Sequence, residues 1–160
     1  MATVTRVLPW RRHSQPPAME VQEIIEQYRK FHPKRSTEVI SEAYRMAAGA
    51  HQGQLRRSGE PYITHPLAVA GIVARYGMDD VTIAAALLHD AVEDTVITLE
   101  ELEEKFGAEL TAIVDGVTKL ERIHFDTKEA QQAATMRKML VAMAKDLRVL
   151  VIKLADRLHN

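Results

Sequence analysis

Apolar residues recur at helical spacing through much of the chain and predict a succession of helices. The first predicted helix covers residues 21–28, where Val21, Ile24 and Tyr28 share one face. A second predicted helix follows the turn at Pro33, and residues between 39 and 50 form its apolar side. Residues 52–63 include two glycines, a proline and two arginines, which is typical of a loop.

The next two predicted helices contain the most apolar part of the chain. Thr64 can cap a helix that tolerates Pro66 in its first turn and ends at Gly77. This helix is apolar almost all round, so we expect it to be buried. Asp79 or Asp80 can then cap a helix that carries the His-Asp pair at positions 89 and 90.

The last part of the pattern is less uniform. Thr98 and Glu101 match a capping box for a short helix that closes at Gly107, and another helix is predicted over residues 110–117. A long helix is predicted from about residue 128 to residue 146. Residues 147–158 could form a buried strand or a buried helix, and periodicity alone leaves both open. The whole pattern predicts an all-α bundle in residues 19–160, after a flexible leader, residues 1–18, that contains three prolines.

Composition restricts the classes of function. The chain has 160 residues, 46% of them hydrophobic, which suits one domain with a core. Its formal net charge of −1 argues against a nucleic-acid groove. Cysteine is absent, which excludes disulfides and thiolate metal sites. We find neither a signal peptide nor an apolar stretch of the roughly 18 residues that span a bilayer, and therefore predict a soluble cytoplasmic protein.

Candidate chemistry is concentrated at His89 and Asp90, which end the apolar run 83–88. If the helix continues, Glu93 lies one turn beyond His89, and Asp94 one turn beyond Asp90. Carboxylates crowded together as they leave water need a compensating partner, and a divalent cation is the simplest one. A solvated helix end with scattered acids is the alternative explanation of this motif alone.

The His-Asp motif and three other blocks of the chain carry a family resemblance. His65 and Asp156 extend the pattern to H…HDxxED…D, which resembles the HD superfamily of metal-dependent phosphohydrolases. Within it, the chain looks like the hydrolase domain of the long RelA/SpoT homologues, which degrade the alarmones ppGpp and pppGpp. The resemblance covers residues 36–160 and rests on four blocks in the family's order: residues 56–66, 87–95, 114–120 and 152–160.

The resemblance implies a role for each group of site residues. Two imidazoles and two carboxylates suit Mn, Fe, Co or Zn better than calcium or magnesium, and the family implies Mn²⁺. The implied metal ligands are His65, His89, Asp90 and Asp156. Matching acids in the family, here Glu93 and Asp94, act near the transferred phosphate. Matching positions that hold the guanine nucleotide are Arg56, Arg57, Ser58 and Asn160. His51 and His159 are not predicted to be ligands.

The resemblance also implies a helix over residues 147–158, with Asp156 and Asn160 on one face. The predicted activity is Mn²⁺-dependent removal of the 3′-pyrophosphate from ppGpp or pppGpp, which gives GDP or GTP. Two alternatives are a catalytically impaired HD domain that binds nucleotide and regulates a neighbouring domain, and an HD phosphohydrolase for another nucleotide. Because the family's last motif continues beyond Asn160, we expect the chain to belong to a longer protein with synthetase and regulatory domains, and to have low activity by itself.

Overall fold

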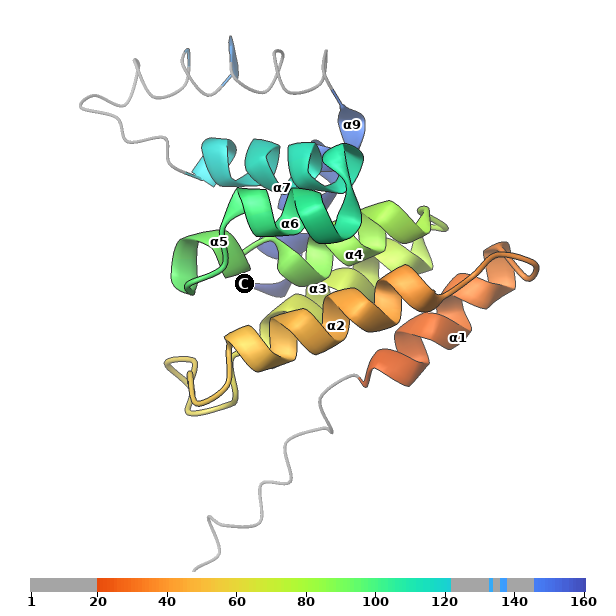
Figure 1. Cartoon of the computed structure of the whole chain (residues 1–160), viewed down its shortest axis with the longest axis horizontal. Coiled ribbons are helices and arrows are strands. Elements are labelled where there is room, and N and C mark those ends of the chain that lie inside the picture. Colours follow the sequence, from red (N-terminus) through yellow and green to blue (C-terminus); the bar gives the residue numbers. More distant parts are fainter. Residues whose placement is uncertain (1–19, 122–132, 134–135, 138–145) are drawn as a thin grey trace, which may run out of the picture.

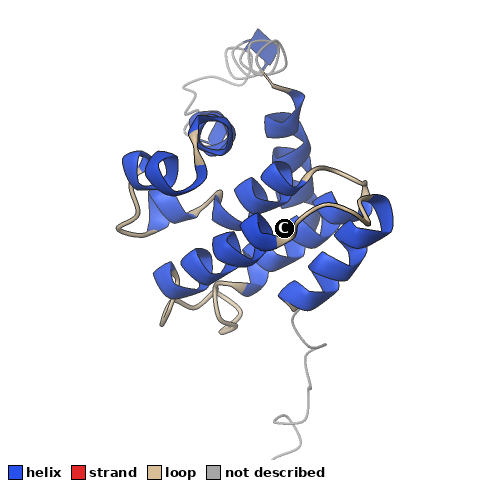
Figure 2. Cartoon of the chain, turned by 45° about the vertical axis from the view of Figure 1, so that its right-hand side comes forward, coloured by secondary structure: helices blue, strands red, loops and turns tan. Residues whose placement is uncertain are grey.

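The computed structural model describes residues 20–121, 133, 136–137 and 146–160, and this part of the chain is helical (Figures 1 and 2). Apart from an isolated β-bridge between Leu55 and Pro61, it contains no strand. The predicted leader and most of the predicted long helix, residues 128–146, lie outside the described residues. The described helices are α1 (Val21–Phe31), α2 (Glu38–Ala50), α3 (Thr64–Arg75), α4 (Asp80–Leu88), α5 (Ala91–Asp94), α6 (Leu99–Phe106), α7 (Ala108–Glu121) and α9 (Leu147–His159).

Helix α4 is the centre of the fold. Every residue from Thr82 to Leu88 is buried, and the helix contacts α2, α3, α7 and α9. Full burial of a Leu or Ile side chain stabilises a fold by about 1.5–3 kcal/mol, so Ile83, Leu87 and Leu88 are a main source of stability. The predicted all-α architecture is confirmed in the described residues.

Most of the predicted helix boundaries have the expected chemistry. The Asp79 side chain accepts a hydrogen bond from the Thr82 N–H at 3.0 Å and caps α4. Thr98 caps α6 by accepting from the Glu101 N–H at 3.2 Å. Gly107 ends α6 with a φ of 92°, a left-handed conformation that glycine adopts without a steric cost.

The predicted cap of α3 is wrong. Ile63 already has helical angles, with φ −55° and ψ −22°, so Thr64 lies inside the first turn. The Thr64 hydroxyl turns back and donates to the Pro61 carbonyl at 2.8 Å. It therefore stabilises the turn that leads into the helix and caps no N–H group.

The chain also departs from prediction at the His-Asp pair, because one helix does not continue through it. Helix α4 ends at Leu88, and α5 begins at Ala91. The imidazole Nδ1 of His89 donates to the Ala86 carbonyl at 2.5 Å. In a continuing helix that carbonyl would accept from the N–H of Asp90. His89 and Asp90 therefore lie in the turn between α4 and α5, although the Asp94 N–H still donates to the Asp90 carbonyl at 3.0 Å and Asp94 lies one turn beyond Asp90.

Residues 147–158 are helical, as the family resemblance implied, and belong to α9. Val149, Ile152 and Ala155 are buried where α9 contacts α3 and α7. The contact with α7 is close at Gly116, where an added Cβ would lie 2.8 Å from a methyl carbon of Val149. This packing brings the last turn of α9 alongside the start of α3. Among the residues that the structure describes, no helix combines the length and the apolar character that a membrane crossing requires.

Candidate metal centre and adjoining pocket

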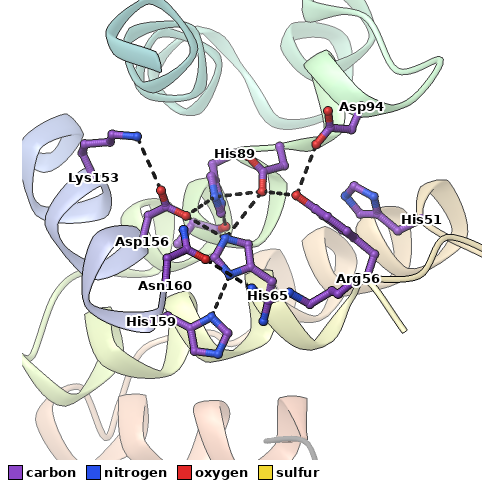
Figure 3. Close-up of polar contacts among 12 residues, drawn as sticks. His51, Arg56, His65, His89, Asp94, Lys153, Asp156, His159 and Asn160 are labelled. Carbon is purple, nitrogen blue, oxygen red and sulfur yellow. Dashed lines mark hydrogen bonds and ion pairs between the residues drawn. The ribbon is translucent and has the colours of Figure 1, made fainter. Parts of the chain in front are cut away.

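Three buried side chains from three helical segments converge at the centre of Figure 3. His65 comes from the first turn of α3, His89 from the end of α4 and Asp156 from the last turn of α9. His65 Nε2 lies 2.6 Å from Asp156 Oδ1, and His89 Nε2 lies 3.5 Å from the same oxygen. Their donor atoms all lie within 4.8 Å of one another, so the three residues could hold one metal ion.

Asp90, the fourth predicted ligand, lies beside this cluster. Its Oδ2 is 3.2 Å from His89 Nε2 and 3.7 Å from His65 Nε2. The same oxygen accepts a hydrogen bond from the Tyr62 hydroxyl at 2.7 Å. The folded chain thus brings all four predicted ligands together from segments that are far apart in the sequence.

The donor atoms fit a bound cation. His89 is fully buried, and its Nε2 faces the carboxylates without a hydrogen bond. Such an atom costs free energy unless it gains a partner. Its other ring nitrogen is held by the Ala86 carbonyl, an arrangement typical of histidines that bind metals. Two imidazoles with two carboxylates match the ligands that Mn, Fe, Co and Zn accept.

The electrostatics of the cluster also favour positive charge. Burial by itself would lower the pKa of His89, but the carboxylates of Asp156 and Asp90 outweigh it and raise that pKa to about 10. Burial opposes ionisation of Asp156 as well, yet the nearby imidazoles of His65 and His89 hold its pKa well below the usual range. The pKa of Asp90 is lowered for the same reason. The same negative field would stabilise a divalent cation at this position.

The two predicted catalytic acids lie on α5, at the edge of the cluster. Asp94 is exposed, and its Oδ2 accepts from the Tyr62 hydroxyl at 3.2 Å. Partial burial and the charge of Asp90 raise the pKa of Asp94. Glu93 precedes it and is half-buried.

A pocket of about 610 Å³ adjoins the cluster, lined by Leu55, Arg56, Arg57, Ser58, Glu60 and Tyr62. Three of the four predicted nucleotide-binding residues therefore line it. The fourth, Asn160, accepts a hydrogen bond from Arg56 Nη2 at 3.2 Å. This hydrogen bond joins the pocket loop to the end of α9, as Figure 3 shows for the labelled Arg56 and Asn160.

Two residues that were not predicted to belong to the site, His159 and Tyr62, contact the predicted ligands, and His51 packs against Tyr62. His159 Nδ1 lies 2.7 Å from His65 Nδ1, and the two rings stack at 5.0 Å. His51 donates from Nδ1 to Gln54, and its ring lies 4.6 Å from that of Tyr62. His159 is three residues after Asp156, so helical spacing alone could have placed it on the same side. Tyr62 lies in a loop, where no periodic signal predicts its direction.

Comparison with known proteins shows to which family the chain belongs. The sequence model of the HD domain matches residues 43–160, a range that contains every predicted site residue. The chain belongs to the HD domain family.

The relatives of this HD domain are RelA/SpoT proteins, as the sequence predicted. A "Probable GTP pyrophosphokinase" of Mycobacterium leprae (strain TN) is 50% identical over 99% of this chain and 20% of its own length. The "Bifunctional (p)ppGpp synthase/hydrolase SpoT" of Escherichia coli (strain K12) is 49% identical over 80% of this chain and 18% of its own length. The chain therefore spans about a fifth of these curated relatives.

A solved structure has the same fold. It belongs to a metazoan orthologue of SpoT that is described as hydrolysing ppGpp, with 32% identity and a TM-score of 0.58. The similarity covers 78% of this chain and 68% of that one. The predicted HD-type helical bundle is thus confirmed.

Proposed function

We propose that this HD domain hydrolyses ppGpp or pppGpp at the 3′-pyrophosphate and releases GDP or GTP with a divalent metal ion, Mn²⁺, as cofactor. The observation that carries the proposal is the buried cluster of His65, His89 and Asp156 beside a pocket lined by arginines. The names of the relatives support the choice of substrate, since several hydrolyse or synthesise this nucleotide. Synthetase and regulatory regions of a longer protein would be its partners.

The four candidate ligands would hold the ion, with His65 and His89 as nitrogen donors and Asp90 and Asp156 as oxygen donors. Such an ion would lower the pKa of a bound water and compensate negative charge on the phosphoryl oxygens. In the proposed reaction a water oxygen bonds to the phosphorus attached at O3′, the P–O3′ bond breaks, and O3′ leaves as a hydroxyl. The result is one nucleoside diphosphate or triphosphate and one pyrophosphate.

The carboxylates of α5 would handle the proton. Glu93 and Asp94 follow Asp90 by three and four residues and are not needed to complete the ligand set. A carboxylate in that place can orient the attacking water, accept its proton and return a proton to O3′. The raised pKa of Asp94 brings its protonation closer to neutral pH, which suits a group that gives and takes protons.

The pocket would hold the nucleotide. Its volume of about 610 Å³ falls in the range of about 300–1,000 Å³ that is common for small-molecule sites. The guanidinium group of Arg56 can stack on a planar base or bind phosphate, and Asn160 is within its reach. Arg57 and Ser58 add a positive charge and a hydroxyl to the same wall.

The test is product analysis by anion-exchange chromatography after incubation of ppGpp with protein and Mn²⁺. We expect GDP and pyrophosphate in equal amounts, only with metal, and a loss of turnover in Asp156→Asn. Asp115→Asn is a matched control, because the Asp115 carboxylate forms an ion pair with Lys119 on α7. Release of orthophosphate, or binding of ppGpp and Mn²⁺ without turnover, would contradict the proposal; the second result would indicate a nucleotide-binding regulatory domain.

A further inference from the structure

Tyr62 is the one residue among those lining the described pocket whose side chain reaches two site carboxylates. Its hydroxyl oxygen lies 2.7 Å from Asp90 Oδ2 and 3.2 Å from Asp94 Oδ2. The two acids come from opposite ends of α5, and both turn toward this hydroxyl. The Tyr62 ring packs against the buried ring of His51 at 4.6 Å, which fixes its direction.

A second contact holds Asp94 in the same place. Gln54 Nε2 donates to the backbone carbonyl of Asp94 at 2.9 Å, and Gln54 is itself held by His51. Two hydrogen bonds thus attach the loop before α3 to α5. The Gln54 side chain donates to the backbone carbonyl of Asp94, and the Tyr62 hydroxyl donates to the Asp94 carboxylate. The arrangement is built from two independent contacts between segments about 30–40 residues apart.

We propose that Tyr62 is a positioning residue: its hydroxyl orients the ligand Asp90 and the acid Asp94 relative to each other and to the nucleotide pocket. The inference rests on the proposed metal centre. Asp90 Oδ2 is the oxygen nearest the two imidazole nitrogens, so the atom held by Tyr62 is the candidate donor atom. Hydrogen bonds to a ligating carboxylate set its orientation and tune its affinity for metal.

A hydroxyl has one hydrogen, so Tyr62 can donate fully to one carboxylate at a time. When Asp90 receives that hydrogen bond, Asp94 faces the oxygen of the hydroxyl and must share a proton with it or turn away. Tyr62 therefore couples the orientation of Asp94 to the position of Asp90, the candidate metal ligand.

The decisive variant is Tyr62→Phe, which removes the hydroxyl and keeps the ring against His51. Mn²⁺ affinity is measured by isothermal titration, and kcat and KM are measured separately with ppGpp. We expect Mn²⁺ binding to weaken about 10–100-fold and kcat to fall at saturating metal. The affinity for a guanine nucleotide without metal should stay unchanged, because the ring still lines the pocket. Tyr76→Phe is the control, since Tyr76 is 71% exposed at the end of α3.

A double-variant cycle with Asp94→Asn separates positioning from a general loss of structure. If Tyr62 acts through Asp94, the effects of the two substitutions on kcat overlap, and the double variant is little slower than the slower single variant. Unchanged Mn²⁺ affinity in Tyr62→Phe, or fully multiplicative effects on kcat, would overturn the inference and leave the proposed hydrolase standing. A parent protein that binds no Mn²⁺ would overturn both.

Discussion

Glu93 and Asp94 are adjacent in sequence and differ in their surroundings. Asp94 is exposed, accepts from Tyr62 and has a raised pKa, mainly because of partial burial and then because of Asp90. Glu93 is half-buried on the same four-residue helix. If an acid transfers a proton without binding the metal, its substitution should lower turnover and leave metal binding unchanged.

Glu93→Gln tests this division of roles. We expect turnover of ppGpp to fall by about 10²–10⁴, the usual contribution of general acid–base catalysis, with Mn²⁺ affinity kept. Single-turnover rates and Mn²⁺ titration are measured on the same preparation. Glu103→Gln on the exposed side of α6 is the matched control. Loss of the metal would make Glu93 a ligand, and an unchanged rate would remove it from the mechanism.

The candidate ligands could be predicted from the sequence because they belong to short motifs in a fixed order. Contacts between side chains that are distant in the sequence could not be predicted in this way. His65 and His159 are 94 residues apart, and their hydrogen bond depends on how α3 meets α9. Tyr62 reaches its two carboxylates from a loop, where no periodic rule gives a direction. The Thr64 cap failed for a related reason, because Ile63 had already entered the helix.

At the scale of elements, the placement of Asp156 depends on how closely α9 approaches α7. The approach is closest at Gly116, where an added Cβ would lie 2.8 Å from Val149 Cγ2. A real Cβ does not tolerate that distance, so the Val149 side chain or the two helices would have to shift. Asp156 lies two turns beyond Val149 on α9, and a shift of the helix would displace it from the histidines.

Gly116→Ala should therefore destabilise the fold by about 1–3 kcal/mol, the usual cost of overpacking, in spite of the better helix propensity of alanine. Gly49→Ala is the control, because Gly49 is also helical and has open space around its Cβ position. It should be neutral or stabilise by up to about 1 kcal/mol. Urea unfolding measures both, and Val149→Ala in the Gly116→Ala background should recover part of the loss. Equal effects at the two glycines would show that the close contact is unimportant.

Periodicity and capping residues predicted most of the described helices, but they left residues 147–158 open and did not predict the break after Leu88. Residues 147–158 carry too many apolar side chains for a period to decide between strand and helix. The break after Leu88 depends on a side-chain hydrogen bond from His89 to the Ala86 carbonyl. Neither feature is encoded in the spacing of apolar residues.

At the scale of the whole molecule, the cluster joins helices that are far apart in the sequence. His65, His89 and Asp156 come from the start of α3, the end of α4 and the last turn of α9. An ion bound to all three would bind the folded chain and not the unfolded one, so it should raise the melting temperature. The proposed metal centre therefore depends on the tertiary structure as well as on the chemistry of its ligands.

The metal centre can be tested by Mn²⁺ titration of the parent chain and of His89→Ala, with the melting temperature followed in parallel. We expect one Mn²⁺ per parent chain, a higher melting temperature with metal, and loss of both in His89→Ala. His32→Gln is the matched control, because His32 contacts the Gly77 carbonyl at the end of α3 and no member of the cluster. It should bind Mn²⁺ like the parent. Equal stoichiometry and affinity in the parent and His89→Ala would contradict the account.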